Sequence, residues 1–205
     1  MILTKIVGGV AALALSTTVA FALLHPGHDH GEKAALGEAA PEFTLMDQEG
    51  NEVSLGDFEG KIVVLEWFND QCPFVKKFYV NGDMNEVADK YEEQGVVWLA
   101  IDSSNFSSVE QNAEIAGEWS IDRPILDDAS GEVGKAYTAQ TTPHMYIINA
   151  DGALVYRGAI DSVRSADPAD VADAENFVAR ALDELLAGES VSLPETKPYG
   201  CSVKY

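Results

Sequence analysis

The stretch VLEWFNDQCPFVKK, residues 64–77, decides the fold. Its first part belongs to an apolar run over residues 62–68 that is interrupted by a single carboxylate, which is typical of a strand buried on both faces. Cys72 stands just past the end of that run, and Pro73 follows it. Proline suits the first position of a helix because it has no N–H to leave unpaired there. The stretch therefore predicts a buried strand, a turn and a helix that begins next to the cysteine.

This position gives Cys72 a chemical interpretation. Unpaired backbone N–H groups at a helix N-terminus favour negative charge. Thiols in such places have a pKa of roughly 3.5–7.5 instead of about 8.5, so they are largely ionised near neutral pH. Lys76 lies one turn along and would either add positive potential or be solvated. We interpret Cys72 as a reactive nucleophile, and the alternative is a small buried hydrophobic residue.

Strands and helices alternate on both sides of this stretch. Turn signals at Glu49-Gly50 and Asp151-Gly152 predict two hairpins. Predicted strands cover residues 42–46, 52–55, 62–68, 96–101, 124–126, 144–148 and 154–157. Predicted helices begin at 73 with a break at 81–82, cover 84–94 and 132–137, run from a cap at Ser108 to 119, and run from a cap at Asp167 to Gly188. This order predicts a mixed three-layer α/β domain over residues 37–188. The acidic run over 161–184 is expected to be a solvated helix face.

Thr142 and Pro143 stand directly before the predicted strand 144–148. A proline that enters a central strand cannot donate to the hydrogen-bond ladder. A cis Thr142-Pro143 bond would explain its presence and would leave the neighbouring backbone free to pair with a substrate chain. Thr142, Pro143 and Pro73 are therefore predicted to line the substrate site beside Cys72.

Taken along the chain, these features resemble the thioredoxin superfamily, and within it the redoxin group that includes alkyl hydroperoxide reductase and thiol-specific antioxidant proteins. The matching motifs span nearly the whole domain: Ala40-Pro41-Glu42-Phe43-Thr44-Leu45, Gly60-Lys61, Cys72-Pro73, Thr142-Pro143 and Asp151-Gly152. The chain is most similar to a peroxiredoxin-like subgroup with Cys-Pro-Phe-Val-Lys and a C-terminal Gly-Cys-Ser-Val/Ile-Lys. The resemblance implies a thioredoxin-like fold, a mixed central sheet flanked by helices, and redox chemistry at Cys72.

The sequence departs from better-known members of this superfamily around the cysteine. Thioredoxins carry Cys-x-x-Cys, whereas Val75 stands at the second position here. Peroxiredoxins carry Pro-x-x-x-Thr-x-x-Cys, whereas Leu65 and Asn69 replace the proline and the threonine. Peroxiredoxins also have an arginine that supports the peroxide, and this chain has Pro143 near that position. Two donors that polarise a peroxide are thus replaced, which argues against fast peroxidase activity.

Glu66 and His144 are further candidates for the site. Glu66 stands where thioredoxins place a buried acid, and on a strand it shares the face of Val64 and Phe68. Burial would raise its pKa and let it exchange a proton with the sulfur through water, whereas a paired or edge-exposed carboxylate would not act in this way. His144 would lie near the sulfur or face the surface. Trp67, Phe68 and Trp98 are assigned to the core.

Cys201 lies in a C-terminal tail, residues 189–205, and the stretch from Gly188 to Cys201 spans roughly 40 Å when extended at about 3.3 Å per residue. It could therefore meet Cys72 of its own chain or of a partner. In a redox role, Cys201 would close a disulfide with oxidised Cys72, and a reductant would restore both thiols. The alternatives are a structural disulfide and a surface thiol.

Composition and the N-terminal residues bound the location and the partners. The 205 residues carry a formal net charge of -21, which argues against nucleic acid as a partner. Residues 1–22 read as an export signal, and the alternative is an uncleaved membrane anchor. Residues 23–36 form a linker with His25, His28 and His30, which could bind Cu or Zn but fit a plain linker better. Either reading of the leader places the domain in the periplasm or outside the cell, where a disulfide persists.

The sequence thus predicts an exported thiol-dependent oxidoreductase that acts through Cys72, with no metal and no organic cofactor. Its expected partners are protein thiols and disulfides, or a hydroperoxide together with a thiol reductant. The sequence leaves open whether the chain forms a homodimer. A peroxiredoxin-type peroxide reductase with Cys201 as resolving thiol is one alternative. A non-enzymatic copper or zinc carrier is another, although Lys76 replaces the second cysteine of the Cys-x-x-x-Cys pattern that such carriers on this fold usually show.

Overall fold

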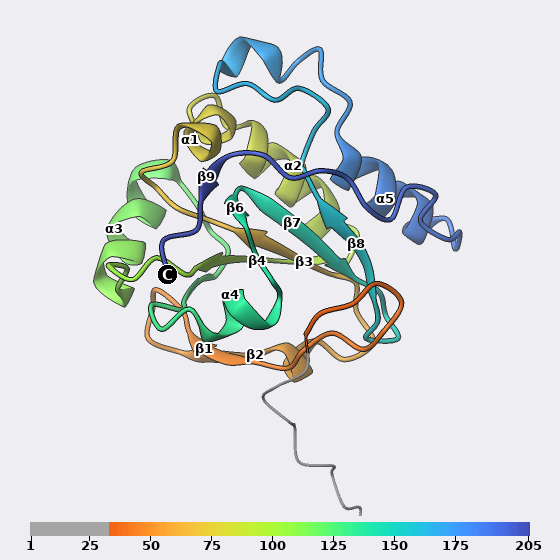
Figure 1. The fold of residues 1–205 in the computed structure, drawn as a ribbon, viewed down its shortest axis with the longest axis horizontal. Helices are drawn as coiled ribbons and strands as arrows, with labels where there is room; N and C mark the ends of the chain where they lie inside the picture. The colour runs from red at the N-terminus through yellow and green to blue at the C-terminus, as the bar shows by residue number, and fades with distance from the viewer. Residues whose placement is uncertain (1–32) are drawn as a thin grey trace, which may run out of the picture.

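The computed structural model describes residues 33–205, so the predicted leader and the His25, His28 and His30 tract lie outside the described residues. A mixed seven-stranded sheet runs through its middle in the order β2-β1-β5-β4-β3-β7-β8 (Figure 1). The strands are β1 (Thr44–Met46), β2 (Glu52–Ser54), β3 (Val63–Trp67), β4 (Val97–Asp102), β5 (Ile125–Asp127), β7 (His144–Ile148) and β8 (Leu154–Gly158). The strands β6 (Thr141–Thr142) and β9 (Cys201–Ser202) form a separate pair. The thioredoxin-like three-layer fold is therefore confirmed.

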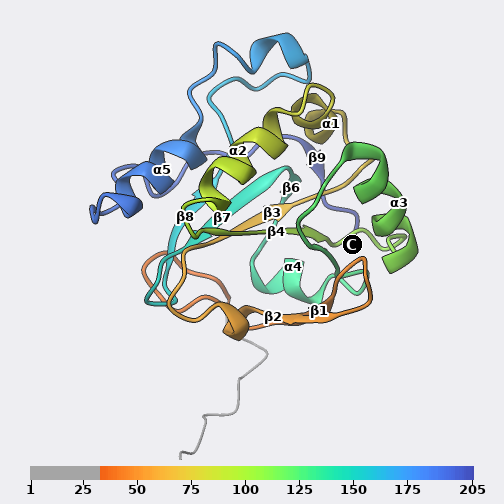
Figure 2. The same cartoon turned by 180° about the vertical axis from the view of Figure 1, so that it is seen from behind.

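Helices cover both faces of the sheet, as the two opposite views show (Figures 1 and 2). One face carries most of them, and α4 lies on the other together with the N-terminal part of the domain. The helices are α1 (Pro73–Tyr79), α2 (Asp83–Glu92), α3 (Val109–Trp119), α4 (Glu132–Ala136) and α5 (Phe177–Leu186), with short 3-10 turns at Leu55–Phe58 and Pro168–Asp170.

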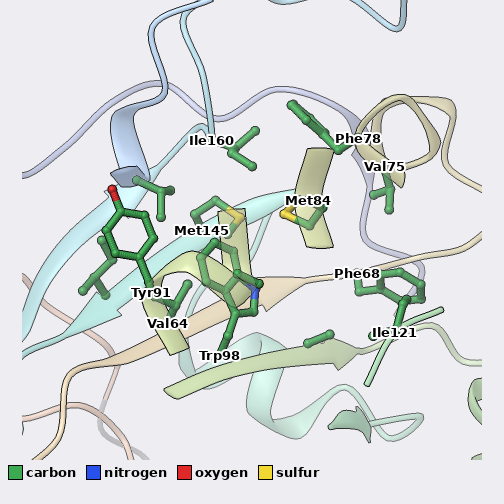
Figure 3. Packing of buried hydrophobic residues seen from close by; sticks show 14 of the residues in the cluster. Val64, Phe68, Val75, Phe78, Met84, Tyr91, Trp98, Ile121, Met145 and Ile160 are labelled. Atoms are coloured by element: carbon green, nitrogen blue, oxygen red, sulfur yellow. The ribbon is translucent and has the colours of Figure 1, made fainter. Parts of the chain in front are cut away.

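Strand β3 is the centre of the sheet, and all five of its residues are buried. It pairs in parallel with β4 and antiparallel with β7. Alternate side chains enter two separate cores, because successive residues of a strand point to opposite faces. Val64, Trp98 and Met145 join the helices α1, α2, α3 and α5 on one face (Figure 3). Trp67 and Tyr146 pack on the other face, against Tyr137, which follows α4.

The predicted local signals are mostly confirmed. Both hairpins form, with β1 paired to β2 and β7 paired to β8. The first helix breaks before α2 as expected, and the Ser108 side chain accepts a hydrogen bond from the backbone N–H of Gln111 at the start of α3. Trp67, Phe68 and Trp98 are buried.

The last helix begins later than predicted. Asp167 caps only the 3-10 turn Pro168–Asp170, which has no buried residue. The helix α5 begins at Phe177, where the Asn176 side chain accepts a hydrogen bond from the backbone N–H of Ala179 at 2.8 Å. A proline and an aspartate at the right spacing can start a turn, but only the segment that buries Val178 and Leu182 continues as a helix.

Both ends of the described chain belong to the domain. Ala34, within the predicted linker, is buried and its N–H bonds the carbonyl oxygen of Ala136 at 2.9 Å. The predicted tail crosses the domain and forms β9 near its end, beside β6 and α1 (Figure 1). Among residues 33–205, no helix is both long and apolar enough to span a bilayer.

The position of the helix start can be tested with two cap variants. Replacing Asn176 with alanine should lower the free energy of unfolding by about 1 kcal/mol, because α5 loses its N-cap. The corresponding change Asp167→Ala should cost clearly less, since its side chain caps only an exposed turn. Urea unfolding of both variants measures the difference, and a larger loss for Asp167→Ala would contradict this boundary.

Candidate active site

The turn between β3 and α1 places Cys72 just beyond the C-terminal end of β3. The Asn69 side chain shapes this turn, because its Oδ1 accepts from the N–H of Gln71 at 2.8 Å and its Nδ2 donates to Ser104 Oγ at 2.6 Å. The N–H of Cys72 then bonds the carbonyl oxygen of Asn69 at 3.1 Å. Cys72 is the N-cap of α1, with Pro73 at the first helical position, as the sequence predicts.

The structure brings three more of the predicted site residues, Thr142, Pro143 and Cys201, beside Cys72. The Thr142-Pro143 peptide bond is cis. Cys72 Sγ donates to the carbonyl oxygen of Thr142 at 3.0 Å, and Cys72 is only 1% exposed. Cys201 is the antiparallel partner of Thr142 in the β6-β9 pair. The two cysteines are therefore neighbours, although no disulfide joins them.

The backbone next to Pro143 is not open to a substrate in this arrangement. Thr141 pairs with Ser202 and Thr142 with Cys201, so the chain's own tail occupies the position that the sequence assigns to a substrate chain. A substrate strand can pair with this segment only after the tail has moved. The role of Thr142 and Pro143 in substrate binding stays a prediction.

The two thiols have different acidities. Burial raises the pKa of Cys72, but hydrogen bonding with Cys201 and Thr142 outweighs this effect, and the pKa falls below its ordinary value. Burial and the neighbouring Cys72 raise the pKa of Cys201 to about 11. Cys72 therefore has the lower pKa of the two thiols and is the better placed to act as nucleophile, and Cys201 is the better hydrogen-bond donor.

Sequence reasoning missed a buried cluster that anchors the tail beside Cys72. Lys77, on α1, is 1% exposed and forms an ion pair with Asp161 at 3.2 Å, and the Tyr199 hydroxyl contacts both. The expectation that the acidic run from 161 is a solvated helix face is therefore wrong at Asp161. A signal existed, because Lys77 follows Phe74 by three residues and shares its side of the helix.

Glu66 points to the face predicted for it, and it is fully buried. Its carboxylate accepts from Tyr79 at 2.9 Å and from Trp98 Nε1 at 3.1 Å, and the guanidinium of Arg123 lies 3.8 Å away. Burial raises its pKa, and Arg123 opposes this shift. None of the described hydrogen bonds joins Glu66 to Cys72, so the contacts favour the paired-carboxylate alternative over the proton-exchange role.

His144 is buried rather than surface-facing, and it lies on the side of Tyr146. Its Nδ1 contacts the Tyr146 hydroxyl at 3.1 Å and the N–H of Gln140 at 3.3 Å. Burial lowers its pKa to about 3, so the ring is neutral. Because Met145, the next residue along β7, packs in the core that contains Cys72, alternation turns His144 to the opposite face.

Two neighbouring thiols can carry two electrons by closing and opening a disulfide. Among residues 33–205, there is no group of three or more His, Cys, Asp or Glu side chains arranged to hold a metal ion. The chemistry that the described site supports is thiol chemistry at Cys72 and Cys201.

Comparisons with known proteins agree with this chemistry. A family model described as AhpC/TSA family matches residues 36–157, which include Cys72 and Thr142-Pro143 but not Cys201. The thiol-disulfide oxidoreductase ResA of Bacillus cereus (strain ATCC 10987 / NRS 248) is 31% identical over 146 residues, which are 71% of this chain and 82% of ResA.

Two solved structures share the fold over most of the chain. A hypothetical protein from Sinorhizobium meliloti 1021 is 27% identical with a TM-score of 0.71, over 85% of this chain and 96% of that one. An uncharacterized conserved protein from Geobacillus kaustophilus is 34% identical with a TM-score of 0.71, over 83% and 92% of the two chains.

The hydrogen bond from Cys201 to Cys72 can be tested through the pH dependence of alkylation. Iodoacetamide reacts with the thiolate, so the rate at Cys72 rises with pH through the pKa of that thiol. In Cys201→Ala the donor is lost, and the midpoint should move to higher pH than in the wild type. In Cys201→Ser a hydroxyl remains, so the shift should be smaller. Rates are followed by mass spectrometry of the Cys72 peptide, and equal midpoints in the two variants would contradict the assignment.

Proposed function

The chain belongs to the AhpC/TSA family of thiol oxidoreductases, and from that premise we propose that it is an exported thiol-disulfide oxidoreductase with Cys72 as nucleophile and Cys201 as resolving thiol. The observation that carries the proposal is the contact between the two cysteines. They are far apart in the sequence, and the pairing of Thr142 with Cys201 brings them together at the start of α1.

The reaction proceeds by two successive exchanges. The Cys72 thiolate attacks one sulfur of a substrate disulfide, forms a mixed disulfide and releases the other substrate sulfur as a thiolate. Cys201 then loses its proton and attacks the Cys72 sulfur, which releases the second substrate thiolate. The substrate gains two electrons, and the chain ends with a Cys72–Cys201 disulfide. An external dithiol or two thiols restore the reduced chain by the reverse steps, so the same site can also oxidise a dithiol.

The order of the steps follows from the two thiols. Cys72 has the lower pKa and reacts first, whereas Cys201 holds its proton and reacts only when a disulfide is next to it. Formation of the mixed disulfide removes the negative charge of Cys72 that raises the pKa of Cys201. Cys201 therefore becomes easier to deprotonate at the step in which it acts as nucleophile.

The proposed substrates are protein or small-molecule disulfides, reduced at the expense of a thiol reductant. Val75 stands where a Cys-x-x-Cys motif has its second thiol, so in this proposal the tail supplies that function. The export part rests on the sequence of residues 1–22 and on the chemistry, since a disulfide cycle of this kind suits a compartment in which disulfides persist.

The stoichiometry of the exchange tests the proposal. The reduced wild type should release two aromatic thiolates per chain from an aromatic disulfide such as 5,5′-dithiobis(2-nitrobenzoate), because Cys201 expels the second one. Cys201→Ser should release one and keep a mixed disulfide at Cys72. Cys72→Ser should lose the rapid release of thiolate, because the remaining Cys201 has the higher pKa. Absorbance of the thiolate and the intact mass of the product measure these outcomes.

Treatment with hydrogen peroxide distinguishes the peroxidase alternative. If one equivalent of peroxide closes the Cys72–Cys201 disulfide faster than one equivalent of the aromatic disulfide does, the chain is a peroxide reductase. A wild type that releases one thiolate and never forms the Cys72–Cys201 link would overturn the role of Cys201.

A further inference from the structure

Lys77 is a buried lysine whose three N–H donors all have partners. Its Nζ lies 3.2 Å from Asp161 Oδ2, 3.1 Å from the carbonyl oxygen of Val163 and 3.0 Å from the Tyr199 hydroxyl. Burial of an ammonium group is costly unless its donors are paired in this way. The three partners come from two segments outside α1, so the ammonium joins α1, the loop at 161–163 and the tail.

The Tyr199 side chain is the part of the tail that enters this cluster. Its hydroxyl donates to Asp161 Oδ1 and accepts from Lys77, and its ring packs edge-on against Phe74 with the ring centroids 5.9 Å apart. Burial raises the pKa of the phenol, and the hydrogen bond to Asp161 raises it further, so it stays protonated and able to donate. Tyr199 is 3% exposed although the tail around it is partly exposed.

Cys201 follows Tyr199 by two residues, and the residue between them fits only as glycine. Gly200 has φ +140 and lies against the carbonyl group of Thr142, where a Cβ atom would overlap the carbonyl oxygen. Beyond Cys201, two residues of the tail are also bonded to the domain. The carbonyl oxygen of Lys204 accepts from the N–H of Asn105 at 2.8 Å, and the hydroxyl of Tyr205 donates to the carbonyl oxygen of Ala139 at 2.9 Å. The strap, residues 199–205, is thus fixed on both sides of Cys201.

We propose that Tyr199, held by Lys77 and Asp161, is the positioning residue that keeps the strap closed over Cys72. The closed strap has two effects. It covers the Cys72 sulfur against outside reagents, and it holds Cys201 at a high effective concentration for attack on a mixed disulfide at Cys72. The first effect is independent of the proposed function, and the second rests on it.

The covering effect is tested in a Cys201→Ser background, in which no internal disulfide forms. Adding Tyr199→Phe removes the hydrogen bonds to Lys77 and Asp161, and we expect the limiting alkylation rate of Cys72 by iodoacetamide, measured at a high pH where the thiol is ionised in every variant, to rise about tenfold. The matched control is Tyr91→Phe in the same background. The Tyr91 hydroxyl also lies between a lysine and an aspartate, Lys90 and Asp183, but it joins α2 to α5 away from the strap.

A second variant opens the strap without touching the cluster. Gly200→Ala in the Cys201→Ser background adds a Cβ that overlaps Thr142, and it should raise the alkylation rate as well. Thermal unfolding of each variant separates strap opening from a general loss of stability. The proposal is overturned if Tyr199→Phe and Gly200→Ala alkylate at the rate of the Tyr91→Phe control.

The effective-concentration effect is tested with both cysteines present. Tyr199→Phe should lower the equilibrium constant for closing the Cys72–Cys201 disulfide in glutathione buffers about tenfold, and Tyr91→Phe should leave it unchanged. If neither the wild type nor the variants form this disulfide but Tyr199→Phe still raises the alkylation rate of Cys72, the proposed function is wrong and the covering effect of the strap is supported. If the disulfide forms with the same constant in all three proteins, the positioning role fails while the proposed function stands.

Discussion

The pairing of Thr142 with Cys201 is the interaction on which the rest of the site depends. It places the second thiol of the chain beside the short segment whose carbonyl oxygen contacts Cys72. Without it, Cys72 would be a single buried thiol at a helix start, and Cys201 would be a thiol on a tail. With it, each sulfur changes the acidity of the other, and the difference between the two pKa values defines which one reacts first.

Two buried ion pairs support the face of the sheet on which Cys72 lies. Glu66 and Arg123 form one inside the core, together with Tyr79 and Trp98, and Lys77 and Asp161 form the other at the far side of α1. Buried charges of this kind add little net stability compared with apolar residues, but losing one partner is costly. Their contribution is therefore better understood as specificity: each pair fixes how α1 sits relative to the segments around it.

The sequence predicts what local patterns can encode. The apolar run of β3, the Cys72-Pro73 helix start, the two hairpins and the cis bond at Pro143 each depend on a few neighbouring residues. The sequence places the start of α5 too early, because cap chemistry does not say which turn will bury enough apolar surface to continue as a helix. The burial of Lys77 and Asp161 and the side to which His144 turns depend on segments distant in sequence. The length of the tail allows Cys201 to meet Cys72 of its own chain or of a partner, but the strand pairing that brings the two together within one chain depends on packing.

Closing the disulfide would also change how the whole domain unfolds. A bond between Cys72 and Cys201 would cross-link most of the described chain into one loop, which restricts the unfolded state far more than the folded one. Folding and oxidation are then linked in a thermodynamic cycle: whatever the bond adds to the stability of the fold, the fold adds to the resistance of the bond against reduction. The redox state of two sulfur atoms is in this way coupled to the free energy of unfolding of the domain.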